Sequence, residues 1–249
     1  MPVTSALGSS ISAELVMAAR KTQRSLDFRK RRKDGRVAKK PGPKPRKKGK
    51  RHVPHSARPE VDARYPLHVV LKVTEEVAEL RTRKAYQAIR RALMRCAARS
   101  DYRVVEISIQ NSHVHLLAEA DSKQALARGM QGFEISAAKQ INRALRRERG
   151  QVFASRYYAK VIKTPTQARN AYAYLFNNWR KHRADRGAPW RIDPWSSAWQ
   201  FRGWATPHGH EAPREPLPVV DAQSWLLREG WLRAKGGLIR LDEVPRSAP

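Results

Sequence analysis

The alternation of apolar and polar residues predicts four strands in the middle of the chain. These strands cover residues 67–73, 102–109, 113–118 and 157–162. In the second strand Val105, Ile107 and Ile109 lie two positions apart, which predicts that they share one buried face. Asn111 and Ser112 form a turn signal between the second and third strands. These two strands are therefore predicted to form a hairpin.

Apolar residues recur at helical spacing in three longer segments. The predicted helices cover residues 81–99, 126–150 and 164–182. The last begins with Thr164 as an N-cap and Pro165 at the first helical position. The order β-α-β-β-α-β-α is typical of an α+β, ferredoxin-like domain with an antiparallel sheet and one added C-terminal helix. Its two crossover helices should cover one face of the sheet, which leaves the other face for chemistry.

The segment after residue 183 differs in composition from this domain. All seven tryptophans lie between Trp179 and Trp231, among prolines and glycines. Residues 221–235 are predicted to form one amphipathic helix that Gly236 and Gly237 end. The tryptophans could stack on unpaired bases, but packing against the domain is favoured. We therefore divide the chain into an arm (1–58), a domain (59–183) and a Trp- and Pro-rich extension (184–249).

The charge of the chain indicates a polyanionic partner. The formal net charge is +29 over 249 residues, and residues 20–51 hold 17 lysines and arginines against two aspartates. Prolines spaced among these cations predict a disordered basic arm that contacts DNA. The predicted DNA-binding residues are Lys39, Lys40, Lys44, Arg46, Lys47, Lys48, Lys50, Arg51 and, in the domain, Arg156. Nucleic acid is favoured over a membrane surface, because no stretch is apolar enough to span a bilayer.

Two histidines in the third strand are candidates for a metal site. His113 and His115 flank Val114, and side chains two apart on a strand project from the same face. Two neighbouring imidazoles can share one metal ion, which would polarise phosphoryl or carbonyl oxygens. The alternative is a pair of histidines on a solvated strand face. The single cysteine, Cys96, lies on a helical apolar face and excludes an internal disulfide, as suits a reducing cytosol.

Several common nucleic-acid chemistries are excluded. No Gly-rich phosphate loop and no zinc-finger spacing is present, and the domain has few of the carboxylates that hydrolytic nucleases use. The third predicted helix offers Tyr172 and Tyr174 as nucleophiles, and only one of them can face the histidines. Asn178 lies one turn after Tyr174, on the same side of the helix. A tyrosine that attacks a phosphodiester forms a covalent phosphotyrosine, which keeps the bond energy for rejoining without ATP.

Taken together, these residues resemble the single-tyrosine HUH transposases of the insertion-sequence superfamily, and in particular the REP-associated tyrosine transposases. The resemblance covers about residues 65–182. It rests on Pro66-Leu-His-Val-Val-Leu-Lys, Gln110-Asn-Ser-His-Val-His-Leu-Leu, Arg128-Gly-Met-Gln, Gly150-Gln-Val-Phe-Ala-Ser-Arg-Tyr and Ala173-Tyr-Leu-Phe-Asn-Asn-Trp-Arg-Lys-His. It implies that His113, His115 and Asn178 hold a metal and that Tyr174 is the nucleophile. The chain departs from the family at Ser112, where Asn is frequent, and at Trp179, where Pro is frequent; neither change removes a catalytic group.

The resemblance implies a DNA transposase that nicks and rejoins single-stranded or hairpin DNA through a covalent 5′-phosphotyrosine. Mg²⁺ or Mn²⁺ is implied by the family, whereas ligand softness alone would favour zinc. The alternative is a domesticated, non-cleaving DNA- or RNA-binding protein on the same scaffold. A structural nucleoid protein would leave the histidines without a role. We expect a cytoplasmic, nucleoid-associated protein, and the sequence leaves open whether the tyrosine acts within one subunit or across a homodimer.

Overall fold

The computed structural model describes residues 60–184 and 189–245. All of the described residues belong to one compact unit. The predicted basic arm, with all of its predicted DNA-binding residues, lies outside the described residues. No helix in the described part of the chain is long and apolar enough to cross a bilayer.

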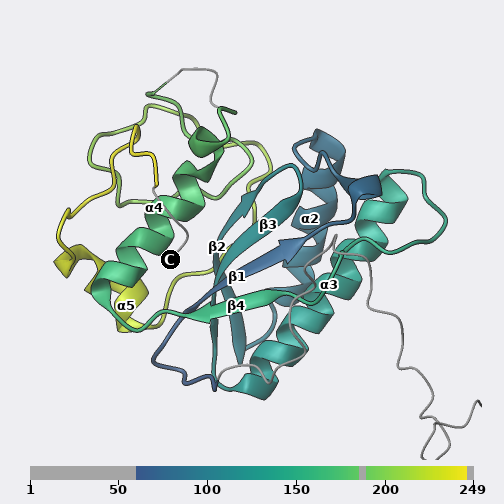
Figure 1. Ribbon diagram of the computed structural model, residues 1–249, viewed down its shortest axis with the longest axis horizontal. Coiled ribbons are helices and arrows are strands. Elements are labelled where there is room, and N and C mark those ends of the chain that lie inside the picture. Colours follow the sequence, from purple (N-terminus) through teal and green to yellow (C-terminus); the bar gives the residue numbers. More distant parts are fainter. Residues whose placement is uncertain (1–59, 185–188, 246–249) are drawn as a thin grey trace, which may run out of the picture. The chain divides into compact units, whose positions relative to one another are not determined.

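The predicted order β-α-β-β-α-β-α is confirmed (Figure 1). Its elements are β1 (Leu67–Lys72), the short 3-10 helix η1 (Glu75–Val77), α2 (Arg83–Cys96), β2 (Tyr102–Ile109), β3 (His113–Ala120), α3 (Lys123–Ala144), β4 (Tyr158–Val161) and α4 (Pro165–Lys181). The first two long helices begin at polar N-caps, Thr82 and Ser122, whose hydroxyls accept from backbone N–H groups of the first turn. Helix α3 ends six residues before Gly150, the predicted end.

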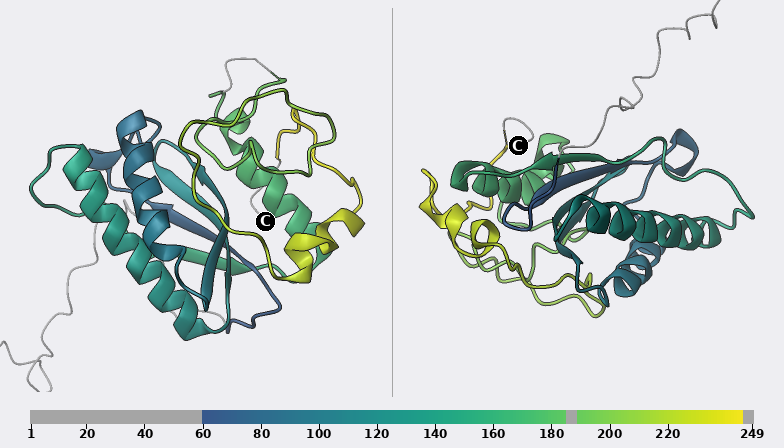
Figure 2. Two further views of the ribbon diagram at one scale, coloured as in Figure 1. Left: turned by 180° about the vertical axis from the view of Figure 1, so that it is seen from behind. Right: turned by 90° about the horizontal axis from the view of Figure 1, so that it is seen from below.

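The sheet is antiparallel, with strand order β2-β3-β1-β4. Helices α2 and α3 pack together on one face of it, and α4 lies on the opposite face (Figure 2). The core under α2 and α3 is built from alternate strand residues and the apolar stripes of both helices. Its most buried large side chains include Leu67, Leu71, Ile89, Leu93, Tyr102, Ile107, Leu116 and Phe133. The ferredoxin-like plan therefore leaves the α4 face for the functional side chains.

A bulge in β2 turns Val105 to the face of the sheet opposite the predicted one. The register with β3 shifts between Val104 and Glu106, so Val105 has no partner across the hairpin. Ile107 packs in the α2/α3 core as predicted, but Val105 packs on the α4 side, and Val104 takes the inward position. The prediction that Val105 and Ile107 share a face was wrong, because one extra residue reverses the alternation.

The segment after residue 189 packs against α4 and the sheet. It contributes Ile192, Ala198, Phe201, Trp204, Leu226, Leu227, Trp231, Ile239 and Leu241 to a second core. Trp204 and Trp231 are buried, as packing rather than base stacking predicts, whereas Trp190 and Trp225 are exposed. Two ion pairs also tie the segment to the domain: Arg81 with Asp193 and Arg169 with Glu243.

The predicted single helix over 221–235 was wrong. The structure has α5 (Trp225–Arg228) and the 3-10 helix η2 (Gly230–Arg233) instead. The buried carboxylate of Glu119 in β3 accepts from the backbone N–H groups of Gln223 and Ser224, which holds the chain extended before α5 begins. The ring of Trp225 packs on Gly230, where a Cβ would lie 2.8 Å from it. Tertiary contacts on both sides thus shorten the helix that the apolar pattern suggests.

Candidate active site

The two histidines of β3 lie on the α4 face of the sheet, as predicted. Their ring centroids are 4.6 Å apart and the rings are nearly perpendicular. His115 is buried and His113 half-buried, whereas Val114 between them packs in the opposite core. The Ser112 hydroxyl lies 3.1 Å from Nδ1 of His113. Strand alternation therefore brings two ring edges together under α4.

Helix α4 carries the predicted tyrosine and asparagine to this pair. It begins with a complete capping box, in which Thr164 and Gln167 satisfy each other's backbone N–H groups. The half-buried ring of Tyr174 meets His115 edge-on, with centroids 5.3 Å apart. One turn on, the side-chain nitrogen Nδ2 of Asn178 lies 3.3 Å from Nε2 of His115. The structure thus places the predicted nucleophile and the three predicted metal ligands together.

Tyr172 points to the other side of α4. Its hydroxyl donates to the backbone oxygen of Leu227 at 2.9 Å, and its ring lies 4.9 Å from that of Phe201. The side chain is buried among aromatic residues of the second core. The prediction that only one of the two tyrosines faces the histidines is confirmed, and that tyrosine is Tyr174.

Two further histidines at the site were not among the predicted residues. His68 of β1 is buried, and its Nε2 lies 3.1 Å from Nδ1 of His115 with the two rings nearly parallel. It also meets the ring of Tyr174 edge-on at 5.7 Å. His182, at the end of α4, lies 6.1 Å from His113. His68 interrupts the apolar run Leu67–Leu71, a signal that the sequence did contain.

Burial keeps the imidazoles of His68, His113 and His115 neutral. Burial, reinforced by the charge of Lys160, lowers the pKa of His68 to about 4. Burial, with His182 and Lys72 as weaker causes, lowers the pKa of His113 to about 4, and burial also lowers that of His115. At neutral pH these rings therefore retain lone pairs for a metal ion. Partial burial raises the pKa of Tyr174, so the free site does not activate its hydroxyl.

The residues present fit a divalent cation. Within residues 60–184 and 189–245, no group of three or more His, Cys, Asp or Glu side chains is arranged to hold a metal ion. The predicted ligand set is of another kind, because it combines the imidazoles of His113 and His115 with the side-chain amide of Asn178. The oxygen Oδ1 of Asn178 is buried and has no hydrogen-bond partner, which is costly unless the group has another purpose. A ligand at this point would satisfy it.

Cations lie at the edge of the histidine cluster. Lys72 at the end of β1 and Lys160 of β4, which pairs with His68, are both exposed. Their charges act on His113 and His68 respectively. Arg156, the predicted DNA contact within the domain, is exposed just before β4. A phosphate that approaches the histidines would therefore meet favourable charge.

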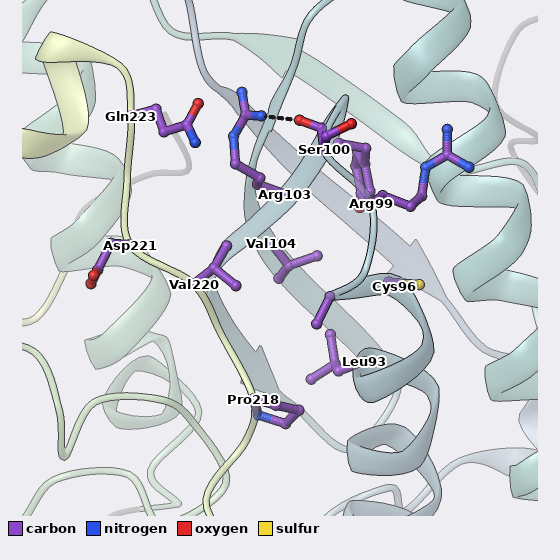
Figure 3. Close-up of a pocket in the computed structure, with 12 residues that line it drawn as sticks. Leu93, Cys96, Arg99, Ser100, Arg103, Val104, Pro218, Val220, Asp221 and Gln223 are labelled. Atoms are coloured by element: carbon purple, nitrogen blue, oxygen red, sulfur yellow. Dashed lines mark hydrogen bonds between the residues drawn. The ribbon is translucent and has the colours of Figure 1, made fainter.

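A separate cavity lies away from this cluster. It has a volume of about 370 Å³ and lies where residues 218–223 cross the end of α2 and the start of β2 (Figure 3). Arg99, Arg103 and Asp221 line it beside apolar side chains, and Arg103 donates to the backbone oxygen of Ser100. None of the predicted catalytic or metal-binding residues belongs to it.

Comparison with known proteins shows what the domain is similar to. Residues 63–178 match the family model of the IS200-like transposases. Among solved structures, the chain resembles a REP-associated tyrosine transposase bound to a REP hairpin, with 14% identity and a TM-score of 0.50 over 68% of this chain and 100% of that one. A candidate transposase from Deinococcus radiodurans R1 shares 11% identity, with a TM-score of 0.34, over 55% of this chain and 98% of that one. No curated protein matches the chain.

Proposed function

We propose that this protein, whose residues 63–178 match the family model of the IS200-like transposases, cuts and rejoins single-stranded or hairpin DNA through a covalent phosphotyrosine. One observation carries the proposal. Tyr174 lies edge-on to His115, whose Nε2 also faces Asn178, while Tyr172 is bonded into the aromatic core. Only one of the two tyrosines has the surroundings of a nucleophile.

In the proposed step Oη of Tyr174 attacks the scissile phosphorus. The new Oη–P bond forms as the P–O3′ bond breaks, the tyrosine loses its proton, and the departing 3′ oxygen takes one up. The product is a 5′-phosphotyrosine and a free 3′-OH, with no net change in protons. A 3′-OH from another end reverses the step at a new junction, so that rejoining needs no ATP.

His113, His115 and Asn178 would hold Mg²⁺ or Mn²⁺. When bound, such an ion supplies electrostatic stabilisation of charge on a non-bridging phosphate oxygen. The histidines are suited to hold it because their pKa values are lowered and their rings stay neutral. The amide of Asn178 contributes a buried oxygen that the protein itself does not satisfy.

Single-stranded or hairpin DNA is the proposed substrate. The net charge of +29 favours a polyanion, and Lys72 and Lys160 border the site. The solved REP-associated transposase, which shares this fold, is bound to a REP hairpin. We expect the predicted basic arm to add affinity for any sequence and the protein to act on the nucleoid in the cytoplasm. Deletion of residues 1–58 should then flatten the dependence of log K on log salt by about 0.7 per lost phosphate contact.

The test is the capture of a covalent adduct. A hairpin oligonucleotide labelled at its 3′ end should remain with the wild-type protein in denaturing gels, whereas a 5′ label should leave on a fragment that ends in 3′-OH. Tyr174→Phe should bind the hairpin and give no adduct, because only the hydroxyl is lost. Tyr172→Phe is the matched control and should give adduct.

The outcomes separate the two candidate functions. Adduct that persists in Tyr174→Phe and vanishes in Tyr172→Phe would reverse the assignment. A wild-type protein that binds the hairpin tightly and never yields an adduct with Mg²⁺ or Mn²⁺ would instead favour the non-cleaving binding protein.

A further inference from the structure

His68 and His115 form a buried imidazole pair across two neighbouring strands. In the β1/β3 register His115 pairs with Val70 and His68 with Leu117, so the two histidines are diagonal neighbours on one face. Nε2 of His68 lies 3.1 Å from Nδ1 of His115, and the two rings are within 13° of parallel. Both rings are almost completely buried. A neutral imidazole has one N–H, so one ring donates the bond and the other accepts it.

Asn178 determines the direction of that bond. Its Nδ2 lies 3.3 Å from Nε2 of His115, and an amide nitrogen can only donate. Nε2 of His115 must therefore accept, which places the His115 proton on Nδ1. That proton is donated to Nε2 of His68, whose own proton is then on Nδ1. The three side chains form one chain of donors that runs from α4 through β3 to β1.

We infer that His68 is a positioning residue that holds the proton of His115 on Nδ1 and so keeps Nε2 of His115 available to a metal ion. The metal half of this inference rests on the proposed function, whereas the position of the proton does not. A metal-ligating imidazole that donates its other N–H to a neighbour has a fixed tautomer and orientation, and loss of that neighbour weakens metal binding. On metal binding the ion would take the place of Nδ2 of Asn178 at Nε2 of His115, and the amide would turn so that its unpaired Oδ1 faces the ion.

An imidazole at position 68 suits this task because it accepts a hydrogen bond without bringing charge. An apolar side chain there would leave Nδ1–H of His115 buried without an acceptor, which favours the other tautomer. A glutamine keeps a neutral acceptor in its side-chain oxygen. His68→Leu therefore removes the hydrogen-bond acceptor while still filling the site, and His68→Gln keeps an acceptor. A comparison of the two variants separates the effect of the acceptor from that of side-chain volume.

The first experiment needs neither metal nor DNA. Nitrogen-15 NMR of the ring nitrogens in the full chain should show the His115 proton on Nδ1 in the wild type and in His68→Gln. In His68→Leu the proton should move to Nε2 in a substantial fraction of molecules. A wild-type His115 that carries its proton on Nε2 would overturn the inference, because the amide of Asn178 would then be turned and His68 would be the donor.

The second experiment measures Mn²⁺ affinity by calorimetry or electron paramagnetic resonance. His68→Leu should weaken binding by about 10- to 100-fold, His68→Gln by less than about 3-fold, and His210→Ala, which removes an imidazole elsewhere, should leave it unchanged. Thermal unfolding checks that each variant is folded. Equal affinity in His68→Leu and the wild type would overturn the positioning role. If the wild type binds no Mn²⁺ while its proton stays on Nδ1, the metal of the proposed function fails and the placement of the proton by His68 is still supported.

Discussion

Helix α4 presents two tyrosines to two different environments. The ring of Tyr174 faces the histidines of the sheet, whereas the hydroxyl of Tyr172 donates to the backbone oxygen of Leu227. The residues are two positions apart, which on a helix turns them about 200° from each other. The same residue type is therefore structural on one side and a candidate nucleophile on the other, and the surroundings alone make the difference.

The two sides of α4 also differ in how well their buried groups are packed or hydrogen-bonded. On the aromatic side Phe201 contacts the rings of Tyr172, Phe176, Trp204 and Trp231, and the side is held by packing. The histidine side buries several ionisable rings, and Oδ1 of Asn178 lacks a partner. Folding favours the first arrangement and disfavours the second. Buried ionisable groups and unpaired polar atoms of this kind are concentrated at functional sites.

The largest expected effect is on the histidine side. His115→Ala should abolish DNA cleavage while changing DNA affinity by no more than a few-fold, because affinity comes mainly from phosphate contacts elsewhere. EDTA should act on the wild type in the same way. Cleavage assays with a labelled hairpin, together with fluorescence anisotropy for affinity, test this. Undiminished cleavage in EDTA would show that cleavage does not need a metal ion.

The next effect belongs to the aromatic side. Phe201→Ala should lower the free energy of unfolding by about 3 to 5 kcal/mol, as for other large buried aromatic residues. Trp190 is 67% exposed, so Trp190→Ala is a control that should change the free energy by less than about 0.5 kcal/mol. Urea unfolding measures both. Equal destabilisation by the two variants would show that the aromatic cluster is not what holds the extension.

Acid should act on the histidine side first. The pKa of His68 is about 4 in the folded protein against 6.5 in the unfolded chain, so the neutral form is favoured by folding. The contribution of this pKa difference to the free energy of unfolding is fully present above pH 6.5 and is lost as the pH falls through about 4. For His68 the loss is about 3 kcal/mol. Urea unfolding between pH 7 and 4 should show a smaller loss for His68→Gln than for the wild type. Parallel pH profiles would contradict the lowered pKa.

The smallest effect is expected for Tyr172→Phe. Loss of its hydroxyl leaves the backbone oxygen of Leu227 unpaired, which should lower the free energy of unfolding by about 1 to 2 kcal/mol. Cleavage by the folded variant should stay near the wild-type rate. If this variant were fully stable and inactive, the two sides of α4 would have to exchange roles.

The sequence by itself determined the elements and their order, because strand and helix periods are local properties of the chain. It also placed Thr164 at the start of α4, and the 200° angle between Tyr172 and Tyr174 limited the nucleophile to one of them. The contacts of His113, His115, Tyr174 and Asn178 follow from that order once the two crossover helices share a face.

Only the tertiary structure decided what depends on register and on contacts between distant segments. The bulge at Val105 reversed a predicted face, since one extra residue in β2 cannot be recognised from alternation alone. The predicted helix over 221–235 was shortened by Glu119, a residue more than 100 positions earlier. His68 joined the site because the β1/β3 register sets it diagonally beside His115. No tight turn joins β1 to β3, so no local pattern sets their register, in contrast to that of the β2/β3 hairpin.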